Sequence, residues 1–195
     1  MANTSATGGY LQPTTPSPAY DVALDIQIQN FVVGITGLSG TRVIPRWQPR
    51  PPAQPERDVD WCAVGILSVE AAYGHYTRHV PTGEGYDEAE AYETLELLAS
   101  FYGPGSGRLA ALLRDGLWVA QNREAMRSQG MALLDVRRIT RVGEDVSGEW
   151  RQRSDLPISL SRAVSRRYPV LNLLQAQVAL ETGQYTQNAT IPPEI

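Results

Sequence analysis

The chain has 195 residues, of which 42% are hydrophobic, enough for one core of ordinary size. Its formal net charge of −4 argues against tight wrapping of nucleic acid, which needs a basic surface. The single cysteine, Cys62, excludes an internal disulfide and a multi-cysteine metal site, and its apolar surroundings predict a buried small side chain. No apolar run approaches the roughly 20 residues of a membrane span. The first residues lack the basic and apolar regions of a signal peptide, so we expect a soluble intracellular protein.

The first part of the chain predicts a flexible arm followed by a helix. Residues 1–16 are small, polar and proline-containing, which is typical of a flexible arm. Ser17 and Pro18 supply a helix N-cap and first helical residue, and Gly34 is a plausible stop. The expected helix has one apolar face, formed by Tyr20, Leu24, Ile28 and Phe31.

The segment between Trp47 and Trp61 is rich in proline and arginine. Proline fixes φ and removes a backbone donor, so residues 49–55 can be neither helix nor inner strand. We expect a stiff, polyproline-like arm that projects from the sheet, is anchored by Trp47 and lies on another protein surface. Its predicted partner contacts are Arg46, Trp47, Gln48, Pro49, Arg50, Pro52 and Trp61.

The remaining pattern predicts strands and two more helices. Residues 74–85, with both histidines, indicate a loop or hairpin tip, and residues 171–182 fit a strand or a helix, with strand favoured. Residues 183–195 predict a loose tail. Strands are expected at 42–47, 60–72, 86–102, 132–142 and 150–165, and helices at 108–118 and 121–129. This order indicates a single α+β domain over 17–182, with a mainly antiparallel sheet and helices packed on one face.

Three patterns suggest ligand chemistry, and each has a simpler interpretation. His75 and His79 have the spacing of metal ligands on a helix, but the glycines and proline around them favour two solvated loop imidazoles. Residues 103–107 have the glycines of a phosphate-binding loop without its Lys-Ser/Thr, so a strand-to-helix turn explains them. The acidic run at 87–96 has no accompanying base or nucleophile, which favours a solvated or lumen-facing strand surface. We therefore predict no catalytic residue, cofactor or metal.

All 17 basic residues are arginine, a residue that suits ordered contacts between proteins. Two arginine clusters, at 137–141 and 162–167, would touch either nucleic acid or the acidic strand of a neighbouring subunit. On an acidic chain we favour the second hypothesis. The predicted interface arginines are Arg137, Arg138, Arg141 and Arg166.

Several blocks carry a resemblance that spans residues 20–175. They are Gly34 to Leu38, Pro45-Arg-Trp-Gln-Pro, Asp60-Trp-Cys-Ala, Glu96 to Pro104, Leu109 to Leu117, Gln121-Asn-Arg-Glu and Tyr168-Pro-Val-Leu-Asn. Together they resemble the neck or tail terminator family of tailed bacteriophages.

This resemblance implies a structural, non-enzymatic protein that forms a ring, usually of six copies. Such a ring caps the tail tube, stops tail polymerisation and joins the tail to the head. The implied partners are further copies of the chain, the tail tube protein and the connector or stopper proteins of the neck, with the tail sheath as a further candidate. The resemblance also implies that the protein assembles in the host cytoplasm and ends in the neck of the virion.

DNA would meet this protein only in passage through the ring. We expect the acidic strand to face that lumen and repel the DNA, through Glu88, Glu90 and Glu96. The alternatives are another connector or stopper protein, a small metal-dependent hydrolase using the two histidines, and a nucleic-acid-binding module.

Overall fold

The computed structural model describes residues 2–48, 50, 52–72, 74–146, 148–173, 176–182 and 185–191. The chain divides into two compact units. The larger unit comprises Ser17–His75 and Glu90–Val164, and the smaller unit comprises Met1–Pro16, Tyr76–Ala89 and Ser165–Ile195. That residues 17–182 form a single domain stays a prediction.

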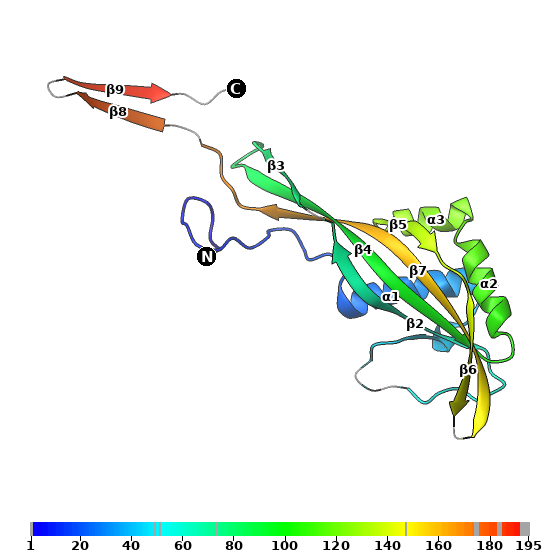
Figure 1. Cartoon of the computed structure of the whole chain (residues 1–195). Helices are drawn as coiled ribbons and strands as arrows, with labels where there is room; N and C mark the ends of the chain where they lie inside the picture. Colours follow the sequence, from blue (N-terminus) through cyan, green and yellow to red (C-terminus); the bar gives the residue numbers. More distant parts are fainter. Residues whose placement is uncertain are drawn as a thin grey trace. The chain divides into compact units, whose positions relative to one another are not determined.

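The larger unit combines three helices with most of a seven-stranded mixed sheet (Figure 1). The helices are α1 (Asp21–Thr36), α2 (Ser106–Gly116) and α3 (Ala120–Arg127), and a short 3-10 turn (Gly40–Arg42) follows α1. The strands of this sheet are β1 (Val43–Pro45), β2 (Trp61–Ala71), β3 (Tyr76–Val80), β4 (Tyr86–Tyr102), β5 (Met131–Val136), β6 (Thr140–Val146) and β7 (Glu149–Tyr168).

The strand order is β1-β2-β4-β7-β5, with β3 paired to β4 and β6 paired to β7. β1 is parallel to β2, whereas the pairs β2–β4, β5–β7 and β6–β7 are antiparallel. The predicted α+β class and mainly antiparallel sheet are therefore confirmed.

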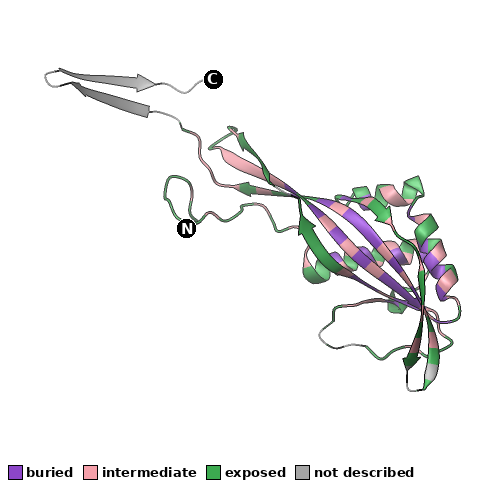
Figure 2. Cartoon of the chain, in the orientation of Figure 1, coloured by how far each residue is buried: buried purple, intermediate pink, exposed green. Residues whose placement is uncertain are grey.

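The core lies on one face of the two long strands. Along β4 the predicted alternation is confirmed, because buried and half-buried residues follow one another in Figure 2. Cys62 on β2 is fully buried in this core, as predicted. The core side chains of β4 and β7 are Leu95, Leu97, Ala99, Phe101, Leu156, Ile158 and Leu160, and those of the helices include Leu24, Ile28, Val32, Leu109, Leu113 and Met126.

Both predicted ends of α1 are wrong. Ser17 does not cap the helix, which begins at Asp21 after an extended Tyr20. Gly34 lies inside the helix, and Gly37, at φ +72°, ends it by donating to the Val33 carbonyl at 2.9 Å. The buried stripe of α1 continues past Gly34, and its burial outweighs the roughly 1 kcal/mol cost of a glycine inside a helix.

The predicted single strand over 132–142 is also wrong, because β5 and β6 divide this segment. Both pair with β7, and their break lies opposite Pro157. Proline has no N–H to donate to a neighbouring strand. At the break, Arg137 donates its backbone N–H to the Pro157 carbonyl at 3.0 Å.

The smaller unit contains β3 and a separate two-stranded sheet of β8 (Ala176–Thr182) and β9 (Tyr185–Ile191). The strand favoured for residues 171–182 is confirmed over 176–182, whereas residues 171–173 lie in no helix or strand. The hairpin predicted at 74–85 includes β3. The loose tail is wrong for residues 185–191, which pair along β8, while residues 192–195 lie outside the described part of the chain. Residues 1–16 run beside residues 167–171, where Ser5 donates to the Pro169 carbonyl at 3.0 Å.

Candidate assembly surfaces

The residues that lead into the proline-rich segment are fixed to the sheet of their own chain. The Trp47 indole donates a hydrogen bond to the Ile66 carbonyl at 2.7 Å, yet Trp47 stays 58% exposed. The Arg46 guanidinium donates to the Ser100 hydroxyl at 2.8 Å. Gly65 permits this approach, because a Cβ there would lie 2.7 Å from the Cβ of Arg46. Trp47 is thus held firmly while most of its indole is still available to another surface.

Residues 46–60 have no helix or strand in their described part, as the prolines predict. Gln48 donates its side-chain amide to the Pro45 carbonyl at 3.1 Å, which keeps it beside its own strand. Arg50 and Pro52 are exposed, and Pro49 lies outside the described residues. That this segment projects as an arm stays a prediction.

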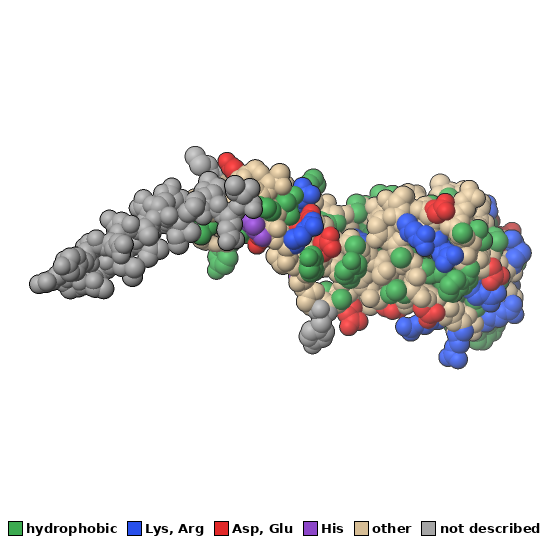
Figure 3. Space-filling view, turned by 90° about the horizontal axis from the view of Figure 1, so that it is seen from above, with side chains coloured by type: hydrophobic (Ala, Val, Ile, Leu, Met, Phe, Trp, Pro, Cys, Tyr) green, Lys and Arg blue, Asp and Glu red, His purple; other side chains and the backbone are tan. Residues whose placement is uncertain are grey.

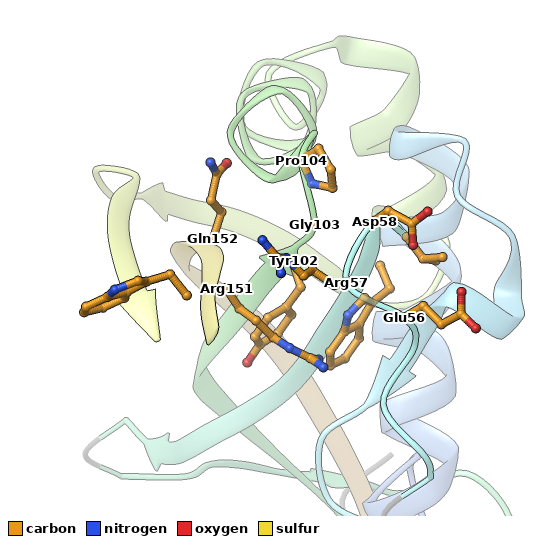
Figure 4. Close-up of a pocket in the computed structure, with 11 residues that line it drawn as sticks. Glu56, Arg57, Asp58, Tyr102, Gly103, Pro104, Arg151 and Gln152 are labelled. Atoms are coloured by element: carbon orange, nitrogen blue, oxygen red, sulfur yellow. The ribbon is translucent and has the colours of Figure 1, made fainter. Parts of the chain in front are cut away.

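Trp61, predicted to contact a partner, is committed to its own sheet. Its ring stacks on Tyr102 of β4 with centroids 4.2 Å apart and planes 8° from parallel, and only 6% of Trp61 is exposed. Both residues line a hollow of about 420 Å³. Tyr102 is labelled among its lining residues in Figure 4. The other lining residues come from residues 56–59 before β2, from the β4–α2 turn and from β7, and are Glu56, Arg57, Asp58, Val59, Gly103, Pro104, Trp150, Arg151 and Gln152.

The glycine-rich turn before α2 closes on a carboxylate of its own chain. Asp60 accepts the backbone N–H of Gly105 at 2.7 Å, so this carboxylate lies at the start of α2, where a negative charge is stabilising. Gly103 is at φ +98°, and a Cβ there would lie 2.6 Å from the Val59 carbonyl oxygen. The turn therefore has a structural explanation, as predicted, and Asp60 occupies the position that an anion would take.

A second hollow, of about 510 Å³, adjoins the first and is rich in arginine. It shares Trp150 and Arg151 with the first hollow and adds Arg108 and Arg141. Trp150 is 72% exposed and its ring covers Gly143, where a Cβ would lie 3.0 Å from the indole. Several arginine side chains of the larger unit are visible together in Figure 3. Exposed tryptophan beside arginine is the composition of interface hot spots, and of these residues only Arg141 was predicted.

On its core face, β4 carries a buried ion pair that the sequence analysis did not find. The Arg162 guanidinium donates through Nε to the Glu93 carboxylate at 3.0 Å, and Arg162 is only 4% exposed. The Tyr20 hydroxyl donates to the same carboxylate at 2.7 Å, and Arg162 lies 4.4 Å above the Tyr20 ring. The signal was present in the sequence, because Glu93 falls in register with Leu95 and Leu97 rather than with the other glutamates.

The glutamates predicted to face a lumen are all half-buried and have different surroundings. Glu96 accepts a hydrogen bond from the Ser159 hydroxyl at 2.7 Å and lies 3.6 Å from Arg137. Glu90 has no ion-pair partner among the described residues. Arginines of the same chain therefore already pair with part of the acidic strand, where we had expected a neighbouring subunit.

In the smaller unit, Glu88 lies between two arginines. Arg78 donates to its carboxylate at 2.8 Å and Arg167 at 3.2 Å, and these hydrogen bonds lower the pKa of Glu88. The other predicted interface arginines of the chain are Arg138, which is exposed, and Arg166, which is half-buried.

Both histidines are exposed, as predicted, and His75 lies outside any helix or strand, but His79 lies in a strand rather than a loop. It lies on β3, with Nδ1 2.7 Å from Asp87 and Nε2 2.8 Å from the Asn172 side-chain oxygen. These hydrogen bonds, to Asn172 first and Asp87 second, raise the pKa of His79. Both ring nitrogens are thus engaged, and the described residues contain no group of three or more His, Cys, Asp or Glu side chains arranged to hold a metal ion.

The fold and these surfaces define an α+β protein with exposed aromatic and arginine-rich surfaces suited to binding other proteins. The sequence profile of the phage neck terminator proteins matches residues 22–184, and the chain belongs to this family. It is therefore a structural protein of the phage neck and tail that associates with other neck and tail proteins. No curated protein matches the chain. In the described residues, no helix is long and apolar enough to cross a membrane.

Proposed function

We propose that this chain forms a closed ring, of six copies, that caps the end of the tail tube and joins it to the head. The observation that carries the proposal is the family match, which covers nearly all of the larger unit. A head-to-tail contact between identical copies closes into a ring when the rotation per subunit divides a full turn. Tail growth would stop because the ring covers the end of the tube without offering another such end.

The contacts that close the ring would come from surfaces that the fold leaves exposed. Trp47 and Trp150 are both large and exposed, and the ring of each makes a contact within its own chain. Rigid aromatic side chains lose little conformational entropy on binding. We therefore assign partner contacts to the proline-rich arm, with Trp47 at its base, and to the surface around Trp150, Arg141 and Arg151.

The acidic strand β4 would line the passage for DNA. Glu90, without an arginine partner among the described residues, would contribute more to repulsion than Glu88 or Glu96, whose charges are balanced by nearby arginines. Replacing Glu90 with glutamine is expected to slow DNA ejection, and Glu88→Gln, which makes the same change of charge, is the matched comparison with a smaller effect. Unchanged ejection kinetics in Glu90→Gln particles would contradict a lumenal position for this strand.

The ring and the capping can be tested with purified components. Light scattering of the purified chain should give a mass close to six times 21.4 kDa, and negative-stain images should show an annulus. Added during polymerisation of the tail tube protein, the chain should bind one tube end and stop elongation. Tubes that keep growing at both ends would contradict the capping function.

The alternative is that the chain acts as a connector or stopper, which is another structural component of the phage neck. Co-sedimentation separates the two possibilities. A terminator binds purified tail tubes, whereas a stopper binds DNA-filled heads in the absence of tails.

A further inference from the structure

We infer that the proline-rich arm of one copy binds a groove between α1 and β2 of the next copy. The arm is defined here as residues 48–57, and the groove is lined by Tyr20, Asp21, Val22, Asp25, Trp47 and Val69, among others. This inference rests on the proposed ring, because it names the surface on which the arm of a neighbouring copy would lie.

The groove has the chemistry of a polyproline-binding site. Its volume is about 420 Å³, and its walls combine two aromatic residues, Tyr20 and Trp47, with aliphatic side chains. Val22 is 67% exposed and Val69 is 48% exposed, so apolar surface remains accessible there. Proline-rich segments with a PxxP pattern bind grooves lined by aromatic side chains, because their extended conformation is largely formed before binding.

The two aromatic walls are held in place before any ligand arrives. The Tyr20 hydroxyl donates to Glu93 at 2.7 Å, and the Arg162 guanidinium lies 4.4 Å from the centre of its ring. Trp47, the other aromatic residue of the lining, is fixed by its hydrogen bond to the Ile66 carbonyl at 2.7 Å. A site whose side chains are already ordered loses less entropy on binding.

The rim of the groove carries two uncompensated carboxylates. Asp21 and Asp25 lie one turn apart on α1, where like charges repel each other. Burial, and then the charge of Asp21, raise the pKa of Asp25. Neither residue has an ion-pair partner among the described residues, and Asp21 has a left-handed φ of +50° that is uncommon outside glycine. A positively charged side chain from an incoming segment would relieve the repulsion between these two carboxylates.

The arm supplies the matching pattern. Pro52 and Pro55 are three residues apart, so they lie on one edge of a polyproline helix with three residues per turn. Arginines flank them on both sides, at Arg50 and Arg57, and both arginines are exposed. Arginine at the end of a PxxP segment would place its charge over the acidic rim while the prolines contact Tyr20 and Trp47.

The arm that fills the groove must come from another copy. In its own chain, Gln54 of the arm accepts a hydrogen bond from Arg151 at 3.0 Å, and Arg151 is not among the residues that line the groove. Glu56 and Arg57 line the hollow beside Tyr102 rather than the groove. One copy therefore presents both a groove and an arm directed elsewhere, which is the arrangement of a head-to-tail contact.

Charge reversal on full-length chains provides the test. The first variant, Asp25→Arg, reverses the groove, and the second, Arg50→Glu/Arg57→Glu, reverses the arm. Each variant alone should need at least a tenfold higher protein concentration than the wild type for half of the chain to assemble, as measured by light scattering. The control Arg127→Glu changes an exposed arginine on α3 and should assemble like the wild type.

An equimolar mixture of the two variants should assemble again, because each normal arm then meets a normal groove and each reversed arm meets a reversed groove. Such alternation is possible in a ring with an even number of copies. Thermal unfolding first establishes that both variants fold, and if Asp25→Arg does not, Asp25→Asn replaces it, with a peptide of residues 48–58 as competitor. With each protein at the concentration where half of it is assembled, the peptide should lower the particle mass of the wild type and have little effect on the groove variant.

The inference is overturned if both variants assemble like the control, if the mixture of folded variants stays dissociated, or if the peptide acts equally on both proteins. The proposed function is judged separately, by whether the wild type stops tube elongation. If the charge-reversal variants still form rings and these rings cap tubes, only the proposed arm contact is refuted. If ring assembly depends on these charges but the wild-type ring does not cap tubes, only the terminator function is refuted.

Discussion

The buried pair of Glu93 and Arg162 yields the prediction with the largest expected effect. Replacing Arg162 with methionine keeps an unbranched apolar stem in the core but leaves the Glu93 carboxylate without its cation. Arg162 makes two hydrogen bonds to Glu93, a third to the Ala19 carbonyl and a stacking contact with Tyr20, all in a setting where it is 4% exposed. Removing one partner of a buried ion pair costs about 3–5 kcal/mol.

For a chain of this size, each kcal/mol lowers the melting temperature by about 2–4 °C, so a decrease of roughly 6–20 °C is expected. Urea unfolding followed by tryptophan fluorescence measures the free energy directly. The protein concentration must be the same for every variant, because assembly stabilises the folded state.

A double variant and a surface control make the interpretation specific. Glu93→Gln/Arg162→Met removes both charges while the amide still accepts the Tyr20 hydroxyl, so it should recover at least half of the loss. Arg127→Met, on an exposed face of α3, should change the free energy of unfolding by less than about 0.5 kcal/mol. If Arg162→Met unfolds within about 1 kcal/mol of the wild type, the buried charge is solvated or paired in some other way and the reasoning is refuted.

Four further outcomes are expected. Gly103→Ala should destabilise the fold by roughly 1–3 kcal/mol, because the φ of this residue is +98° and an added Cβ would meet backbone atoms. Gly34→Ala should instead stabilise the fold by about 0.5–1 kcal/mol in the same urea assay, because an added Cβ meets open space inside α1. Because the pKa of His79 is raised in the folded state, its contribution to the free energy of unfolding is fully present below pH 6.5 and is lost as the pH rises through the folded-state pKa. NMR should show the contact between His79 and Asn172 loosening over that pH range in the wild type, with no such change in His79→Gln. Cys62 should react with a thiol reagent only at the rate of unfolding, because it is fully buried and burial raises its pKa; rapid labelling of the native protein would contradict this.

The amino-acid sequence by itself determined the elements with a strong local pattern. The alternation over residues 95–102 predicts a strand, and β4 has the predicted bounds of Tyr86–Tyr102. The prolines among residues 49–55 argue against helix and inner strand there. Helices α2 and α3 begin and end within about two residues of their predicted positions, because apolar spacing is read from neighbours along the chain. Family membership was also indicated by short sequence blocks.

The tertiary structure alone decided which distant residues meet. Glu93 and Arg162 are 69 positions apart, and their pairing depends on which faces of β4 and β7 turn toward α1. The division of residues 131–146 into β5 and β6 follows from Pro157 on the neighbouring strand, which no local pattern in that segment reveals. Periodicity reports only how a segment can bury one of its faces. The partner of that face is chosen by many weak contacts formed together when the chain folds, and these contacts are not encoded at any single position.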